Sequence, residues 1–235
     1  MRTLVLLPGM DGSDVMFRPL VATAPAGMEL VTIAYPSGAA NAYEDLLPRV
    51  QAILPRDRPF YLLGWSFSGP LALMAAAARP PFLRGVMLAS SFARSPIPYL
   101  PRWARHLARS FVFRLYPAAS RVKALLGGHA TPEVRALLAQ THARAGAEAL
   151  ACRARAALSV DAMDALAACP VPILYLRAGA DEVIPASRAA DIQRALPSVE
   201  IADIPGPHLA LVTNPSEAWV RLGAFMDRIE SARRG

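Results

Sequence analysis

One serine of this chain stands where a nucleophile would be expected. The segment 61–73 changes from an apolar, strand-like run into an alanine-rich, helical run, and Gly64, Ser66, Ser68 and Gly69 stand at the change. A serine on a sharp strand-to-helix turn presents its hydroxyl to a neighbouring base, and small residues around it let the turn close. The usual spacing is Gly-x-Ser-x-Gly, in which Ser68 here replaces the second glycine. The segment predicts a nucleophilic Ser66; a polar residue filling an ordinary corner is the alternative.

A serine hydroxyl becomes a useful nucleophile when an imidazole accepts its proton and a carboxylate fixes the tautomer of that imidazole. His208 follows the last predicted strand, in a loop that Pro205 and Pro207 stiffen on either side of Gly206. Parallel strands all end at one sheet edge, so we expect this loop on the same side as the Ser66 turn and predict His208 as the base. The other histidines fall in a helical region, where solvated or pocket-lining roles fit them better: His106, His129 and His142.

The carboxylate that orients the base is predicted to be Asp181. It lies in the loop after the preceding predicted strand, between Gly179 and Pro185, and therefore at the same edge of the sheet. Its neighbour Glu182 has a longer side chain, which we expect to face solvent. Weaker candidates for the same role are Asp191, Asp203, Asp161 and Asp164.

Two backbone amides are needed to stabilise the oxyanion of an acyl-transfer reaction. Phe67, the residue after the serine, supplies one by its position at the start of the helical run. The second is expected from the loop 8–13, which reads Pro-Gly-Met-Asp-Gly-Ser, with Met10 as the donor. Gly9 and Gly12 give this loop the freedom to turn its amides toward the site.

A parallel sheet must position these residues, because short β-rich runs alternate with helical stretches along the chain. Most of the strand candidates are continuous apolar runs, as buried parallel strands are. The strands are predicted at residues 3–7, 29–34, 60–63, 85–89, 173–177 and 200–204. The helices between them are predicted at 42–54, 67–79, 185–196 and 215–229, the last with Asn214 as its N-cap. The expected fold class is α/β, with a mostly parallel six-stranded sheet flanked by helices.

Residues 93–166 interrupt this alternation, since they show helix patterns and no convincing strand. Helices are predicted there at 101–116, 118–126, 132–143 and 147–157. A helical segment inserted between two strands of one sheet must lie over its edge as a cap, where open α/β sheets bind ligands. The chain therefore divides into a core of residues 1–92 and 167–235 and an inserted cap. Trp65 of the core, with Trp103 and Phe111 of the cap, are candidates to line an apolar substrate pocket.

The composition fits one globular domain, with 235 residues, 54% of them hydrophobic and 18% charged. The longest apolar run covers residues 71–78, far short of the ~20 residues that span a bilayer. The N-terminus shows no signal-peptide pattern, so we expect a cytoplasmic protein. Cys152 and Cys169 are the only cysteines, so we expect no disulfide framework. No His/Cys/Asp cluster has metal-ligand spacing and no glycine-rich phosphate loop occurs, so we expect neither a metal nor another cofactor.

The formal net charge is +7, and the basic residues are concentrated in one region. Residues 93–160 contain eleven Lys and Arg against two Asp and Glu. Such a block can attract anionic partners such as phosphates or acidic carrier proteins. A bias toward arginine is the alternative, since Lys123 is the only lysine of the chain. No basic stretch is interleaved with stacking aromatic residues, so nucleic acid is not an expected partner.

The loops that carry Met10, Ser66, Asp181 and His208 together resemble those of the α/β-hydrolase superfamily, in particular of small serine esterases whose first loop reads Pro-Gly-x-Asp-Gly. The motifs that carry the resemblance lie at 4–13, 64–69, 178–185 and 206–208. The order Ser66, Asp181, His208 matches the nucleophile, acid and base order of that superfamily. The resemblance covers nearly the whole chain outside the cap, and it implies an oxyanion hole formed by the amides of Met10 and Phe67. The two N-terminal antiparallel strands of the superfamily are missing, so the expected sheet is minimal.

The expected substrate is a small-molecule carboxylic ester with an apolar acyl group, cleaved without a cofactor through an acyl-enzyme on Ser66. A thioesterase, or an esterase for acyl groups carried by CoA or an acyl carrier protein, is the alternative, since both carriers are anionic and the cap is basic. Acyl transfer to an alcohol or amine differs only in the acceptor. A non-catalytic binding module on the same fold is the alternative from another class, and the serine, aspartate and histidine at the three expected places argue against it.

Overall fold

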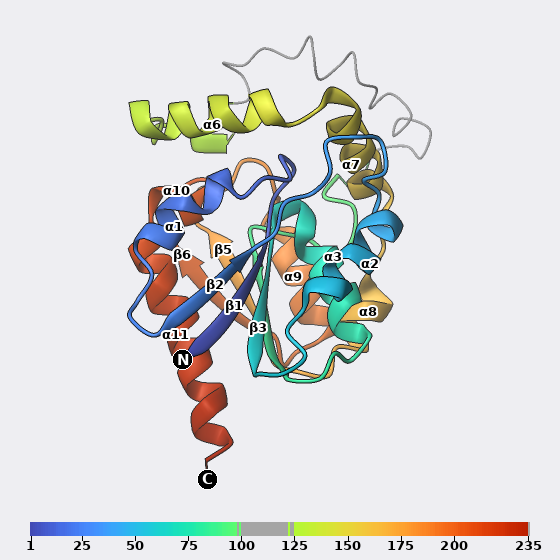
Figure 1. Ribbon diagram of the computed structural model, residues 1–235, viewed down its shortest axis with the longest axis vertical. Coiled ribbons are helices and arrows are strands. Elements are labelled where there is room, and N and C mark those ends of the chain that lie inside the picture. Colours follow the sequence, from blue (N-terminus) through green and yellow to red (C-terminus); the bar gives the residue numbers. More distant parts are fainter. Residues whose placement is uncertain (98, 100–121, 123–124, 235) are drawn as a thin grey trace.

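The computed structural model describes residues 1–97, 99, 122 and 125–234. Within them, six strands form one sheet in the order β2-β1-β3-β4-β5-β6, and every neighbouring pair is parallel (Figure 1). The strands are β1 (Arg2–Leu7), β2 (Met28–Thr32), β3 (Phe60–Trp65), β4 (Leu83–Ala89), β5 (Ile173–Ala178) and β6 (Glu200–Ile204). The predicted α/β class with a six-stranded sheet is confirmed, and the sheet is parallel throughout rather than mostly parallel.

Helices cover both faces of this sheet. One face carries α2 (Tyr43–Ile53), α3 (Gly69–Ala77), α8 (Met163–Ala167) and α9 (Ser187–Ala195). The other carries α1 (Arg18–Ala22), α10 (Ala210–Thr213) and α11 (Pro215–Ala232). Alternation along β1 divides the core accordingly, because Val5 and Leu7 pack into the first layer while Leu4 and Leu6 pack into the second. All four side chains are fully buried, which explains the continuous apolar run of this strand.

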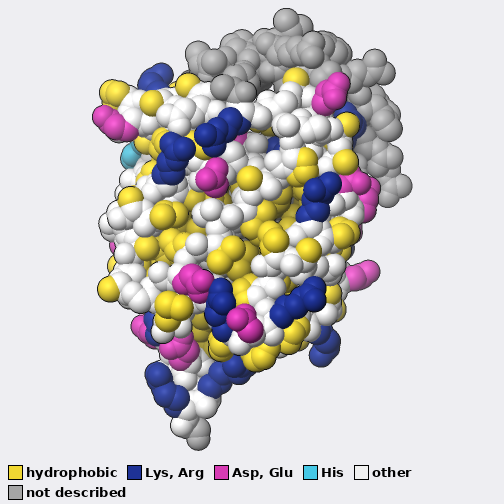
Figure 2. Space-filling view, in the orientation of Figure 1, with side chains coloured by type: hydrophobic (Ala, Val, Ile, Leu, Met, Phe, Trp, Pro, Cys, Tyr) yellow, Lys and Arg dark blue, Asp and Glu magenta, His cyan; other side chains and the backbone are white. Residues whose placement is uncertain are grey.

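The strand β2 forms one edge of the sheet, and residues Met28–Val31 are only partly buried. On the face that carries this edge, hydrophobic side chains gather at the centre and charged side chains surround them (Figure 2). The strand is five residues long. A short edge offers few free backbone groups to another chain.

The predicted elements differ from the observed ones mainly at their ends. The helix predicted at 67–79 begins as a single 3-10 turn, η2 (Ser66–Ser68), and continues as α3. Asn214 does precede α11, but its side chain makes no cap hydrogen bond and instead donates to the Pro205 carbonyl at 2.8 Å. The short helices α1, α8 and α10, and the 3-10 turn η1 (Val15–Phe17), were not predicted, because each is too short to show a periodic pattern.

Above the carboxyl ends of the strands lie α6 (Pro132–Arg144) and α7 (Ala147–Ser159) (Figure 1). They match the helices predicted at 132–143 and 147–157. The chain leaves and rejoins the core at one point, where the Ala162 amide donates to the Ala93 carbonyl at 2.8 Å and the Ser95 amide to the Val160 carbonyl at 3.1 Å. The helix predicted at 101–116 lies outside the described residues, as does most of that predicted at 118–126. The division into core and cap stays a prediction.

Candidate active site

Ser66 occupies the tight turn between β3 and α3. Its φ is 50°, in the left-handed region that residues other than glycine rarely adopt. Gly64 allows this turn, because a β-carbon at position 64 would lie 2.4 Å from the Ser68 carbonyl oxygen. The Ser91 hydroxyl donates to the Ser66 carbonyl at 2.6 Å and holds the backbone of the turn. Ser66 is therefore fixed at the carboxyl edge of the sheet in a conformation that costs free energy on its own.

Ser68, which replaces the second glycine of the usual spacing, is fully buried. Its hydroxyl donates to the Pro8 carbonyl, in the loop that follows β1. The Tyr35 hydroxyl lies 2.6 Å from the same oxygen. A serine hydroxyl carries one proton, so Tyr35 must be the donor of that second hydrogen bond. The departure from Gly-x-Ser-x-Gly thus ties the Ser66 turn to the loop that holds Met10.

The structure brings Ser66, His208 and Asp181 together, although they are far apart in the sequence. His208 Nε2 lies 3.0 Å from Ser66 Oγ, and His208 Nδ1 lies 2.9 Å from Asp181 Oδ2. A carboxylate can only accept, so Nδ1 carries the proton and Nε2 is free to accept the serine proton. The side chains of His208 and Asp181 are 4% and 7% exposed. The three residues form a continuous hydrogen-bonded chain that is almost closed to water.

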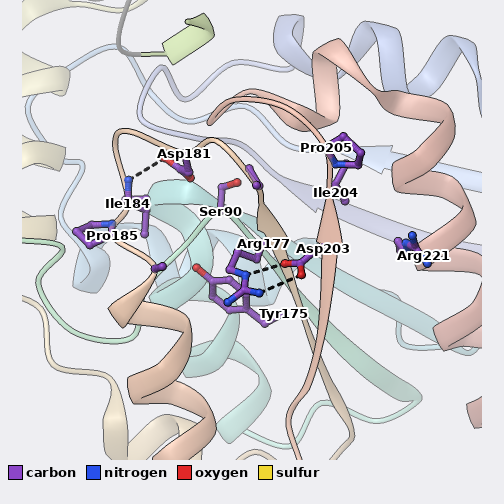
Figure 3. A pocket seen from close by; sticks show the side chains of 13 residues that line it. Ser90, Tyr175, Arg177, Asp181, Ile184, Pro185, Asp203, Ile204, Pro205 and Arg221 are labelled. Atoms are coloured by element: carbon purple, nitrogen blue, oxygen red, sulfur yellow. Dashed lines mark hydrogen bonds and ion pairs between the residues drawn. The ribbon is translucent and has the colours of Figure 1, made fainter.

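Asp181 is held as a carboxylate despite its burial. Burial on its own raises the pKa of Asp181, but the hydrogen bond and charge of His208 lower it, and the net pKa lies below the usual value. The amides of Val183 and Ile184 both donate to Asp181 Oδ1 at 2.8 Å, and the Ile184 contact is visible in Figure 3. The loop between Gly179 and Pro185 therefore supplies the donors that fix this acid.

The competing acids have other partners or lie elsewhere. Glu182 is exposed, as expected. Asp203 forms an ion pair with Arg177 at 2.6 Å, which lowers the pKa of Asp203. Two further candidates also pair with arginines: Asp191 with Arg188 and Arg194, and Asp161 with Arg94. The last, Asp164, is exposed in the first turn of α8. Among the other histidines, His129 is exposed, His142 belongs to α6, and His106 lies outside the described residues.

The two residues expected to supply oxyanion donors flank Ser66. Phe67 is fully buried, its carbonyl accepts from the Tyr43 hydroxyl at 2.8 Å, and its ring stacks on Tyr43 with centroids 4.7 Å apart. Met10 lies in a turn that the Gly12 amide closes by donating to the Gly9 carbonyl at 3.0 Å. A β-carbon at Gly9 would lie 3.8 Å from Ser66 Cβ, so this turn lies directly against the serine. Among the described residues, none accepts a hydrogen bond from the Met10 amide.

One residue beside the site gave no signal in the sequence. Arg153 of α7 is 1% exposed, and its guanidinium donates to the Met10 carbonyl at 3.0 Å. In the sequence it is one of eleven basic residues in a helical region, and the residues that it contacts are far from it along the chain.

A cavity of about 560 Å³ opens beside Ser66 and His208. Its walls are mostly apolar and come from the loops at the sheet edge, from α6 and α7, and from the segment before α6. They include Met10, Met16, Trp65, Leu125, Leu138 and Leu209. Trp103 and Phe111, which were also expected here, lie outside the described residues.

A second cavity, of about 550 Å³, has Asp181 in its wall (Figure 3). Its walls include the buried Ser90, the Tyr175 ring and the ion pair between Arg177 and Asp203. Neither Ser66 nor His208 lines it. This cavity therefore contacts Asp181 but neither the Ser66 hydroxyl nor the His208 imidazole.

Across the residues that the structure describes, no group of three or more His, Cys, Asp or Glu side chains could hold a metal ion. No helix within the same residues is long and apolar enough to cross a membrane.

Sequence comparison finds that the model of the alpha/beta hydrolase family matches residues 4–222. Phytyl ester synthase 1, a chloroplast protein of Arabidopsis thaliana, is 38% identical over 111 residues. That match spans 42% of this chain but only 16% of the plant protein.

Solved structures of several enzymes share the fold. A bromoperoxidase from Bacillus anthracis superposes with a TM-score of 0.82 at 18% identity, over 96% of this chain and 92% of that one. A thermophilic esterase from Thermogutta terrifontis gives 0.82 at 19% identity, over 97% and 90%. An esterase from Exiguobacterium antarcticum gives 0.82 at 15% identity, over 97% and 92%. At these identities the likeness establishes a common fold.

Proposed function

Because the chain belongs to the alpha/beta hydrolase family, we propose that it is a serine esterase that cleaves carboxylic esters through an acyl-enzyme on Ser66. Ser66 is the nucleophile, His208 the base, and Asp181 the residue that orients the base. The distance of 3.0 Å between His208 Nε2 and Ser66 Oγ carries the proposal, because a proton can pass directly over it.

The reaction has two halves that use the same groups. In the first, the Ser66 oxygen attacks the ester carbonyl carbon while its proton passes to His208 Nε2; the adduct then collapses, and the imidazolium returns that proton to the leaving alcohol. In the second, water gives a proton to Nε2 as its oxygen attacks the acyl carbon. The bond between the acyl carbon and Ser66 breaks, the acid leaves, and Ser66 recovers its proton. Asp181 keeps Nδ1 protonated and balances the charge of the imidazolium throughout.

The negative charge on the carbonyl oxygen is stabilised by the amides of Met10 and Phe67. The Met10 amide has no partner among the described residues, and its turn lies against Ser66. Removing one such donor typically lowers the rate by about 100- to 1000-fold. The acyl group occupies the apolar cavity, with Trp65 on its wall. Trp103 and Phe111 remain proposed lining residues of the same pocket.

Replacement of Ser66 tests the proposal. Ser66→Ala should abolish hydrolysis of p-nitrophenyl butyrate above background, and a fluorophosphonate probe should label Ser66 of the native protein but leave Ser66→Ala unlabelled. Ser231→Ala, at an exposed position of α11, is the matched control and should keep both properties. Full ester turnover by Ser66→Ala would contradict the proposal. Absence of the probe adduct from native protein would favour a non-catalytic binding module instead.

The apolar cavity also favours a second candidate, transfer of the acyl group to an alcohol in place of water. A partial relative carries the name phytyl ester synthase, which is in line with this chemistry. The acyl-enzyme would form as before, and the alcohol would give its proton to His208 as its oxygen attacks the acyl carbon. Incubation with an activated ester and a long-chain alcohol distinguishes the two: new ester supports transfer, and free acid alone supports hydrolysis.

A carrier-bound thioester is the remaining alternative substrate. Of the basic residues between 93 and 160, Arg135 lines the cavity, while Arg94 and Arg144 form ion pairs with Asp161 and Asp14. If these charges recruit an anionic carrier, kcat/KM for acyl-CoA should fall steeply with salt, whereas that for a neutral ester should not. A flat salt profile with acyl-CoA would exclude this alternative.

A further inference from the structure

Arg153 is a buried cation, and within the described part of the chain its hydrogen bonds go to uncharged acceptors. Its side chain reaches from α7 into the core, where Nε donates to Asn41 Oδ1 at 2.9 Å, Nη1 to the Met10 carbonyl at 3.0 Å and Nη2 to the Pro36 carbonyl at 2.9 Å. The guanidinium also lies over the Tyr35 ring, 5.5 Å from its centroid. A buried charge is costly unless it is hydrogen-bonded on all sides. All three nitrogens of this side chain have a partner.

The three acceptors belong to two loops that meet beneath α7. Met10 lies in the turn after β1, and Pro36 and Asn41 lie in the loop after β2. Asn41 is itself fully buried, and its amide donates to the Pro36 and Gly38 carbonyls at 2.9 and 2.7 Å. The same helix also approaches this second loop at its N-cap, because a β-carbon at Gly146 would lie 2.4 Å from the Ser37 carbonyl oxygen. The guanidinium therefore joins the helix to both loops at once.

The turn after β1 is shaped to receive this side chain. Gly12 has φ of 70°, and a β-carbon there would lie 2.4 Å from Arg153 Cζ. The Gly12 carbonyl accepts from the Tyr35 amide at 2.7 Å, which holds the far end of the turn. Burial lowers the pKa of Arg153, and the charge of the nearby Asp11 opposes this effect only in part. Any side chain at position 12 would displace the guanidinium.

We propose that Arg153 is a positioning residue for the oxyanion hole, because its hydrogen bond to the Met10 carbonyl fixes the turn that presents the Met10 amide to the reacting carbonyl. The inference rests on the proposed esterase function. Only the α-carbon of Met10 separates the carbonyl that Arg153 holds from the amide that faces the substrate. Without that hydrogen bond, the peptide between Met10 and Asp11 is free to rotate and no longer fixes the α-carbon of Met10. The preceding Gly9–Met10 peptide, which carries the Met10 amide, can then also turn, and the amide samples directions in which it does not meet the oxyanion.

The consequence is specific to the transition state. Ester binding depends mainly on the apolar cavity, so KM should change little, whereas kcat should fall as oxyanion stabilisation is lost. A merely structural role for Arg153 would lower the thermal midpoint and the number of active molecules, but it would leave kcat per active molecule unchanged. The two roles can thus be separated by counting active sites.

The test compares Arg153→Met with the native protein, each titrated to completion with a fluorophosphonate to count reactive Ser66. For p-nitrophenyl butyrate, kcat per titrated site should fall by roughly 10- to 100-fold, part of the full loss of one oxyanion donor. A trifluoromethyl ketone, whose carbonyl carbon Ser66 attacks to give a negatively charged hemiketal oxygen, should lose affinity by a similar factor. Arg194→Met, at an arginine whose side chain is 76% exposed on α9, is the control and should match the native protein in both measurements.

A second variant covers failure of the first to fold. Asn41→Ala leaves Arg153 in place but removes the acceptor that orients its Nε, and it should lower kcat per titrated site in the same direction with KM unchanged. Native kcat per titrated site and native ketone affinity in Arg153→Met would overturn the proposal. Native values in Asn41→Ala would do so if Arg153→Met does not fold. Failure of the native protein to react with the fluorophosphonate would overturn the esterase function instead, before any variant is compared.

Discussion

The hydroxyl groups of Tyr35 and Ser68 lie 2.6 Å apart in the interior of the protein. Tyr35 donates to Ser68, and Ser68 in turn donates to the Pro8 carbonyl. This short chain of donors links the loop after β2, the Ser66 turn and the loop after β1. The Tyr35 ring lies beneath the Arg153 guanidinium as well. The two loops beside Ser66 are therefore held both from the core and from α7.

Replacement of Ser68 by glycine should destabilise the protein, although it restores the usual Gly-x-Ser-x-Gly spacing. The Tyr35 hydroxyl and the Pro8 carbonyl would lose their partner inside the core, and each buried polar group left unpaired costs about 1–3 kcal/mol. Urea unfolding measures the loss. The double variant Tyr35→Phe/Ser68→Ala should cost less than the sum of its single variants, because it removes donor and acceptor together. Strictly additive costs would show that the two hydroxyls are not coupled.

Asp181→Asn should lower kcat by about 10⁴-fold while leaving the protein folded, since the loss of an orienting carboxylate has an effect of that size in a serine protease. An amide in place of the carboxylate can donate to His208 Nδ1 and favour the tautomer that cannot accept the Ser66 proton. Glu182→Gln makes the same chemical change at the exposed neighbour and should leave kcat unchanged. Equal kcat values for the two variants would exclude Asp181 as the orienting acid.

The contribution of Asp181 to stability should depend on pH in one direction. Its pKa lies below the usual value in the folded protein, so folding favours the carboxylate. In the unfolded chain the pKa is about 3.9, and the stabilisation is complete above that value and is lost as the pH falls through the folded pKa. The difference in unfolding free energy between the native protein and Asp181→Asn should therefore shrink below about pH 4. A difference that grows over the same acidic range would contradict the assigned shift.

Filling the apolar cavity should shorten the acyl chain that the enzyme accepts. Leu138 lines the cavity from α6, and Leu138→Trp should reduce kcat/KM for octanoyl esters by at least 10-fold while sparing acetyl esters. Each methylene group removed from water contributes about 0.8 kcal/mol, or roughly fourfold in kcat/KM. Ala136→Trp adds the same ring at an exposed position of this helix and should leave the preference unchanged. A uniform loss for both esters would place Leu138 outside the acyl site.

The constellation of Ser66, Asp181 and His208 could be predicted because each residue follows a strand, and parallel strands place their carboxyl ends together. The membership of the α/β-hydrolase superfamily, inferred from the same loops, is confirmed by the family match. The narrower likeness to esterases with a Pro-Gly-x-Asp-Gly loop stays a prediction. What could be predicted was thus set by local pattern and topology.

Arg153 could not be predicted, because its acceptors at Met10, Pro36 and Asn41 are more than 110 positions away and none of them forms a motif with it. Only part of the role of Gly12 could be predicted from the sequence. The sequence suggested only that a glycine there frees the backbone, whereas the structure shows that it also leaves room for a guanidinium. Ser68 was interpreted as a small substitute for glycine, and its hydrogen bonds depend on Tyr35, which no spacing connects to it.

The two backbone hydrogen bonds that join residues 93–95 to residues 160–162 have an evolutionary consequence. Since the polypeptide departs and returns at neighbouring points, a segment of another length would fit between them without moving a single strand. If Arg153 positions the Met10 turn as proposed, it limits that freedom, because a replacement segment that lacks an equivalent guanidinium would leave the loop carrying Met10 without this hydrogen bond. Substitutions that change the substrate would then fall in the cavity wall, while Arg153 would be retained.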